Sequence, residues 1–214
     1  MVRKPAALKE TPSQTAGPYV HIGMAPKLAG LDGPYPAEPG ACIAGPEAKG
    51  QRIQITGRIL DGQGDPLRDA VIEVWQADAS GIYNSPRDPR YEDRDPAVFG
   101  WGRVATDLKS GDYLIETIKP GEVPGPGESV MAPHLTLWIV ARGINLGLST
   151  RIYFSEEEAA NAADPVLARV LPPGRRATLI ASAEDAGGNG GGAPLRYRFD
   201  IRLQGGDETV FFDC

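Results

Sequence analysis

Apolar and polar positions alternate along much of the chain from residue 51 onward. In "RIQITGRIL", residues 52–60, apolar side chains recur at Ile53, Ile55 and Ile59, on one face of an extended strand. The segment "DGQGDPLRD" then supplies turn residues before the next apolar run. We expect further strands in "AVIEVWQAD", "GDYLIETI", "STRIYF", "ATLIASAE", "LRYRFDIRLQG" and "ETVFF". The pattern therefore predicts a fold built mainly from short strands.

The run "MAPHLTLWIV", residues 131–140, presents two different faces when it is extended. One face is apolar and consists of Leu135, Leu137 and Ile139. The other face is mixed and carries His134, Thr136, Trp138 and Val140. A pair of histidines at positions 134 and 136 would aim two imidazoles at one metal ion, but the second position is Thr136. The strand therefore has the form of a metal-binding strand with one ligand lost.

One segment carries a clear helix signal. In "SEEEAANAA", residues 155–163, Ser155 stands at an N-cap position and Glu158 follows three residues later, which is a capping box. The acidic residues also suit the positive end of a helix dipole. We expect a short helix on the surface. Short strands separated by turns, with one peripheral helix, predict an all-β fold of the antiparallel β-sandwich class.

The first fifty residues are rich in Pro, Gly and Ala, and we expect an N-terminal arm and loops at 1–50 and the sandwich domain at 51–214. Tyr19, Val20 and Ile22 are costly to expose together, so we expect the arm to pack against another surface. Two further segments predict loops. Residues 79–98 form a loop long enough to indicate function, and "GGNGGG" forms either a loose hairpin loop or a locally disordered stretch.

Composition and charge exclude several classes of protein. The chain has 22 basic and 28 acidic residues, a net charge of −6, and no basic cluster, which argues against nucleic-acid binding. It has neither an apolar run of membrane-spanning length nor a signal-like apolar segment near its start. Cys42 and Cys214 make a poor disulfide framework. We therefore expect a cytoplasmic protein without membrane contact.

Five stretches, namely "VIEVWQADASGIY", "GWGR", "TIKPGEVP", "APHLTLWIVARG" and "RIYF", resemble the intradiol ring-cleaving dioxygenases in that order. The resemblance implies a β-sandwich enzyme in which two tyrosines and two histidines bind non-haem Fe(III), because hard phenolate oxygens suit that ion. The family's ligand positions fall on Tyr83, Val123, His134 and Thr136 of this chain. An arginine expected near the iron is replaced by Met131. We therefore expect no metal and no catalytic residue in this chain.

The resemblance also implies a partner, a homologous β chain that holds the Fe(III), and a larger oligomer of such αβ units. It implies that the arm of this chain lines the partner's substrate pocket for a small aromatic acid, a carboxylated catechol. The expected substrate-binding residues are Thr15, Gly17, Pro18, Tyr19 and Arg142. From the residues alone, "TAGPY" is a packing turn and Arg142 a surface cation, so both interpretations stay open.

The remaining candidate residues are expected to be structural. We expect His21 to bond to backbone, Tyr83 and His134 to bond to each other or through water, and the tryptophans to pack in the core or an interface. Two alternatives for function stay open. In one, the chain is an iron enzyme that uses Tyr83, His134 and an acid such as Glu116 or Glu122. In the other, it is a module that binds small aromatic molecules without a partner.

Overall fold

The computed structural model describes residues 14–33, 35–184 and 193–213. Its strands are β1 Arg52–Leu60, β2 Val71–Trp75, β3 Trp101–Ala105, β4 Asp112–Ile118, β5 Val123–Pro124, β6 Val130–Met131, β7 His134–Val140, β8 Leu148–Phe154, β9 Ile180–Glu184, β10 Leu195–Arg198 and β11 Ile201–Arg202. The α-helices are α1 Val20–Met24 and α2 Glu158–Ala163. Three short 3₁₀ turns complete the elements, at Tyr91–Asp93, Leu167–Arg169 and Pro173–Leu179.

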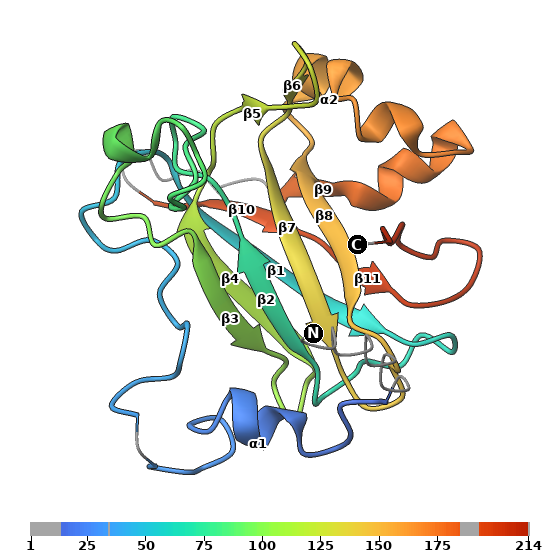
Figure 1. Cartoon of the computed structure of the whole chain (residues 1–214). Helices are drawn as coiled ribbons and strands as arrows, with labels where there is room; N and C mark the ends of the chain where they lie inside the picture. Colours follow the sequence, from blue (N-terminus) through green and yellow to red (C-terminus); the bar gives the residue numbers. More distant parts are fainter. Residues whose placement is uncertain (1–13, 34, 185–192, 214) are drawn as a thin grey trace, which may run out of the picture.

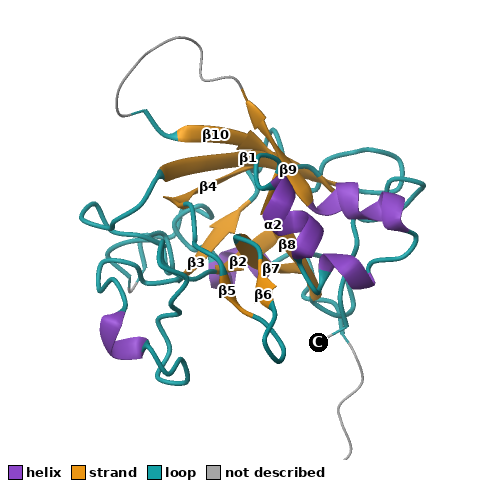
Figure 2. Cartoon of the chain, turned by 90° about the horizontal axis from the view of Figure 1, so that it is seen from above, coloured by secondary structure: helices purple, strands orange, loops and turns teal. Residues whose placement is uncertain are grey.

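Nine of the strands form one large sheet in the order β11-β1-β10-β9-β8-β7-β2-β3, with β4 paired to β1, and β5 and β6 form a separate hairpin. The large sheet folds over on itself, so that β4, β1 and β10 lie above β3, β2, β7 and β8 (Figure 2). Most pairs are antiparallel, which confirms the predicted all-β fold class. β1 pairs in parallel with β10 and β11, and the parallel pair of β8 with β9 connects the two layers.

The core lies between the two layers. The apolar positions predicted on β1, namely Ile53, Ile55 and Ile59, belong to the same buried cluster as Leu135, Leu137 and Ile139 on β7. Each of these six side chains is at most 1% exposed. Burial of an Ile or Leu side chain stabilises a fold by roughly 1.5–3 kcal/mol, so these two strands hold the layers together.

The predicted helix forms, but it begins later than the capping box indicates. Helix α2 starts at Glu158 with Glu157 as its N-cap, and no side chain caps it. The Ser155 hydroxyl accepts a hydrogen bond from the Ala183 N–H of β9 at 3.1 Å. The prediction of a capping box is therefore wrong, because the hydroxyl that would cap the helix accepts a hydrogen bond from the neighbouring strand. Helix α2 and the turns after it cover one end of β8 and β9 (Figure 1).

The N-terminal arm contains one turn of helix, α1, that the sequence pattern did not predict. Val20 is buried against Val71 and Val140, at the end of β2 and β7 where α1 lies in Figure 1. Tyr19 remains 74% exposed and Ile22 is 38% exposed, so the expected packing is only partly made within this chain. The His21 Nδ1 atom is buried without a hydrogen-bond partner, which corrects the expected bond to backbone.

The hairpin β5–β6 was not predicted, and two further strand assignments need correction. Strand β3 was missed, because "WGRVA" lies beside Gly and Trp and shows little alternation. The C-terminal run "ETVFF" makes only an isolated bridge between Phe212 and Ser149. Thr209 N–H donates to the Arg202 carbonyl, whereas Phe212 N–H donates to the Ser149 carbonyl. The segment therefore crosses from β11 to β8 and does not pair along either strand. The "GGNGGG" loop and Cys214 lie outside the described residues. In the described part of the chain, no helix has the length and apolarity needed to cross a bilayer.

Candidate functional site

The sheet brings the positions of the family's ligands together. Trp75 of β2, Thr136 of β7 and Arg151 of β8 are register partners and form one row across the three strands. His134 and Tyr153 form the next row along β7 and β8. Because register partners and residues two apart on a strand share one face, these side chains lie on the same side of the sheet.

His134 is 3% exposed, and its Nδ1 lies 2.7 Å from the Ala132 carbonyl oxygen. A carbonyl only accepts, so Nδ1 carries the proton and Nε2 presents its lone pair. That Nε2 atom has no hydrogen-bond partner. Burial lowers the pKa of His134 to about 4, and the nearby charge of Arg151 acts in the same direction. The ring is therefore neutral near pH 7, and the expected direct hydrogen bond to Tyr83 is not formed.

Tyr83 stacks on Trp75, with ring centroids 5.9 Å apart and an interplanar angle of 7°. It follows a tight turn at Gly81, where φ is +74° and the carbonyl of Glu122 approaches closely. This turn fixes the tyrosine beside the segment that leads into β5. Burial raises the pKa of the Tyr83 phenol, while the charge of Arg151 acts to lower it. The phenol is therefore protonated near neutral pH.

Val123 and Met131 face each other in the β5–β6 hairpin. Val123 is buried and has no donor atom. The Arg151 Nη1 atom lies 3.4 Å from Met131 Sδ and 3.2 Å from the Tyr153 hydroxyl. Arg151 therefore lies beside Thr136 and Tyr153 and reaches the β5–β6 hairpin, and the sequence pattern gave it no role.

The residues at these positions do not fit Fe(III). They offer one neutral imidazole and one protonated phenol, and neither Val123 nor Thr136 supplies a strong ligand. A fixed guanidinium beside them opposes any added cation. In residues 14–33, 35–184 and 193–213, no group of three or more His, Cys, Asp or Glu is placed to hold a metal ion. Glu116 hydrogen-bonds Gln54 on β1, so it does not complete a site with His134.

The second group of predicted residues gathers where the arm meets the loop after β7. The Thr15 hydroxyl accepts a hydrogen bond from Gly143 N–H at 2.9 Å and lies 3.3 Å from the Ala141 carbonyl. Gly17 follows with φ of +76°, a conformation that favours glycine. Thr15 therefore fastens the arm to both neighbours of Arg142.

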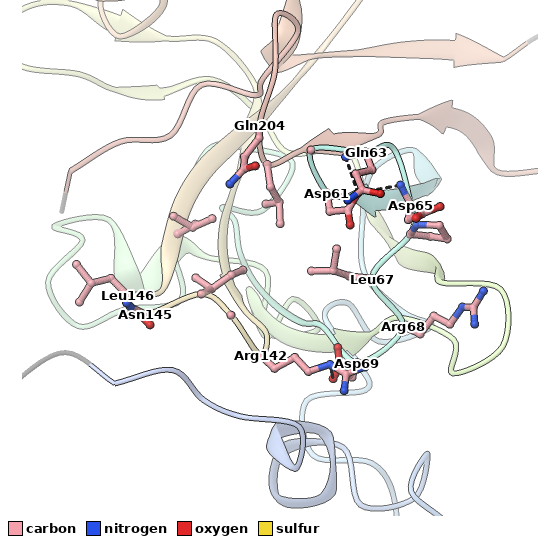
Figure 3. A pocket seen from close by; sticks show the side chains of 16 residues that line it. Asp61, Gln63, Asp65, Leu67, Arg68, Asp69, Arg142, Asn145, Leu146 and Gln204 are labelled. Atoms are coloured by element: carbon pink, nitrogen blue, oxygen red, sulfur yellow. Dashed lines mark hydrogen bonds and ion pairs between the residues drawn. The ribbon is translucent and has the colours of Figure 1, made fainter.

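Arg142 is held by Asp69, with 2.9 Å between Nε and Oδ2, and its side chain is 65% exposed. The pair lies at the edge of an open pocket of about 1120 Å³ formed by the loops around 61–69, 142–148 and 203–204 (Figure 3). Arg68 lines the same pocket but points outward. Within the described residues, the terminal nitrogens of Arg142 donate no hydrogen bond to the protein. They remain available for an anion.

Pro18 and Tyr19 complete the predicted group, and both are exposed. They do not line the pocket beside Arg142. Trp75 and Trp138 are also partly exposed, at 36% and 42%, so they do not belong to the core. Sequence reasoning missed Asp69 and Arg151. Arg151 had a usable signal, because it is a charge in the middle of the apolar strand "STRIYF".

Comparisons with known proteins agree on one family. Residues 33–205 match a family model described as Dioxygenase. The chain is 45% identical over 206 residues to the protocatechuate 3,4-dioxygenase alpha chain of Pseudomonas putida, covering 96% of this chain and 97% of that protein. It is 37% identical over 170 residues to the beta chain of that enzyme from Burkholderia cepacia, covering 76% and 68%.

A solved structure supports the same fold. The 3-chlorocatechol 1,2-dioxygenase of Rhodococcus opacus 1CP superposes with a TM-score of 0.56 at 24% sequence identity. The match covers 80% of this chain and 70% of that chain. This likeness concerns the fold alone, since the identity is low.

Proposed function

This chain belongs to the dioxygenase family, and from that premise we propose that it is the iron-free alpha subunit of a protocatechuate 3,4-dioxygenase. The observation that carries the proposal is the contrast between two sites in one chain. The family's ligand positions are filled by residues that do not fit Fe(III), whereas the arm and Arg142 form an intact, exposed surface. A homologous beta chain would supply the Fe(III).

The proposed contribution of this chain is to bind and orient the substrate, 3,4-dihydroxybenzoate. The free nitrogens of Arg142 suit a carboxylate, because a guanidinium donates two parallel hydrogen bonds to it. The ion pair with Asp69 holds the arginine while leaving those nitrogens exposed. Gly17 lets backbone approach a flat ring, Pro18 shapes the turn, and Tyr19 offers its hydroxyl. Such positioning favours the reaction without bond-breaking by this chain.

The proposed reaction of the assembled enzyme is intradiol cleavage. Dioxygen opens the ring between its two hydroxyl-bearing carbons and gives 3-carboxy-cis,cis-muconate, so both oxygen atoms remain in the product. This step belongs to the breakdown of aromatic compounds. We propose that the arm at 1–50 reaches the beta chain and that the domain at 51–214 packs against the beta chain. The assembly is proposed to be cytoplasmic and to consist of repeated αβ units.

Arg142→Gln tests this role in the αβ complex. We expect the KM for 3,4-dihydroxybenzoate to rise about tenfold or more, because a charge-assisted hydrogen bond to the carboxylate is lost. The affinity for catechol, which lacks the carboxylate, should stay unchanged, measured as turnover or as competitive inhibition. Arg68→Gln is the matched control, since Arg68 lines the same pocket but points outward. Equal losses for both substrates would contradict the assigned role.

A further inference from the structure

We propose that Arg151 takes the place of the metal cation in the family's former ligand set and keeps metal ions out of it. The inference rests on the iron-free part of the proposed function and names the residue that enforces it. It also assigns a role to Arg151, a cation within strand β8 that the proposed substrate binding does not use.

The position of Arg151 is central to the set. It is the register partner of Thr136, the position at which the family has its second histidine. On β8 it is two residues from Tyr153, whose register partner is His134. Neighbouring strands lie about 4.8 Å apart, so a side chain at 151 reaches the space that a ligand at 136 would enter.

The contacts of Arg151 extend to the other ligand positions. Its Nη1 atom lies 3.4 Å from Met131 Sδ, and Met131 pairs with Val123 across the β5–β6 hairpin. The guanidinium also interacts electrostatically with Tyr83 and with His134. One cation therefore interacts with three of the four positions and contacts the register partner of the fourth, Val123. It donates hydrogen bonds where a metal ion would accept electron pairs.

A buried carboxylate balances this charge. The Arg151 Nη1 atom donates to the Tyr153 hydroxyl at 3.2 Å, and that hydroxyl donates to Asp164 Oδ1 at 3.3 Å. Asp164 is fully buried and also accepts from the N–H groups of Ala132, Val166 and Leu167 at 2.8–2.9 Å. The chain Asp164–Tyr153–Arg151 is thus anchored at its buried end.

Two separate features then oppose metal binding by the remaining donors. The His134 Nε2 lone pair is buried and unpartnered, but the second imidazole is missing at Thr136. Independently, an arginine cannot lose its proton in a protein, so its charge always repels an incoming cation. Restoring the histidine alone should therefore be insufficient. Removing the arginine as well should make the site able to bind a metal.

Titration with Co²⁺ of the full chain and its variants tests this inference, using isothermal calorimetry and the visible absorption of bound Co²⁺. Thr136→His should bind weakly, and Thr136→His combined with Arg151→Gln should bind at least tenfold more tightly. Replacement by Arg151→Lys in the same background should stay weak, since the charge is kept. Arg196→Gln in that background is the matched control, because Arg196 is an exposed arginine on β10, which pairs with neither β7 nor β8.

The outcomes separate the two proposals. If the double variant with Arg151→Gln binds Co²⁺ no more tightly than Thr136→His, the inference is wrong. If the unmodified chain binds Co²⁺ tightly at this set, the inference and the iron-free part of the proposed function both fail. Circular dichroism establishes that each variant is folded. Should Arg151→Gln not fold, Arg151→Met removes the same charge with a similar length and carries the same test.

Discussion

His134 is the first residue of β7, and one of its nitrogens is bound to a carbonyl while the other has no partner. The groups that face it are Arg151 and Tyr153 of β8 and Asp164 beyond α2. Burial and the guanidinium disfavour its charged form, while the Ala132 carbonyl and Asp164 favour it, and the net result is a pKa of about 4. The neutral ring is therefore part of the folded state.

This pKa predicts how stability depends on pH. The unfolded histidine takes up a proton as the pH falls through 6.5, whereas the folded one does so only near pH 4. Its contribution is therefore present above pH 6.5 and is lost as the pH falls from 6.5 to about 4. Linkage puts the loss at roughly 3 kcal/mol.

Urea unfolding across this pH range measures the effect, with His134→Gln as the comparison. The difference in unfolding free energy between the two proteins should be constant above pH 6.5 and should shrink below it. The other titrating groups cancel in this difference. A difference that does not change with pH would contradict the buried neutral histidine.

The sequence predicted the positions of some functional residues but not of others. The alternation in "MAPHLTLWIV" correctly put His134 and Thr136 on one face, because the period of a strand is local. Arg151 was missed because its role depends on which strand pairs with β7 and in which register. Likewise, no pattern joined Arg142 to Asp69, which lies about seventy residues away along the chain and is reached only by folding.

At the scale of elements, β1 depends on a close approach at Gly57. A Cβ atom there would lie 1.8 Å from the Phe199 carbonyl oxygen, on the neighbouring segment between β10 and β11. The Phe199 N–H donates to Thr56 at 2.9 Å, and its carbonyl accepts from the Tyr113 hydroxyl. Gly57 therefore permits β1 to hold two parallel partners and β4 at once.

Gly57→Ala should destabilise the fold. We expect a loss of about 1–3 kcal/mol or more, because the added methyl group must displace backbone and not a flexible side chain. The midpoint of chemical unfolding measures this loss. Gly206→Ala is the matched control, since a Cβ there meets nothing within 4 Å. Equal midpoints for the two variants would contradict the close approach.

Strands with a strong alternation of apolar and polar residues were predictable. Elements whose bounds depend on contacts with other elements were not. Strands β1, β2, β4, β7 and β8 follow their apolar patterns. The hairpin β5–β6 lies in a segment rich in Pro and Gly, where local pattern predicts only a connection. The start of α2 was misplaced because Ser155 bonds to Ala183, a contact between elements far apart in sequence.

At the scale of the whole molecule, the isolated chain leaves large apolar side chains uncovered. Tyr19, Phe99 and Leu146 are each more than half exposed. The arm is tied to the body through Thr15, yet the aromatic residue that follows projects into solvent. Surfaces of this kind are typical of subunits that pack against a partner.

This exposure predicts self-association of the chain when it is purified alone. Sedimentation velocity over a range of concentrations should show oligomers or aggregates that give way to defined complexes when the beta chain is added. The physical reason is that the partner removes the same apolar area from water. Stable monomers at high concentration, with no change on adding the beta chain, would contradict this prediction.

The central claim is that this chain completes an iron enzyme without binding the iron. Its most direct test is to measure iron content and oxygen uptake with 3,4-dihydroxybenzoate, for the chain purified alone and for the chain co-expressed with a homologous beta chain. The account predicts that the lone chain is free of iron and inactive, whereas the pair is loaded with iron and active. A lone chain that retains stoichiometric iron and consumes oxygen would contradict the account.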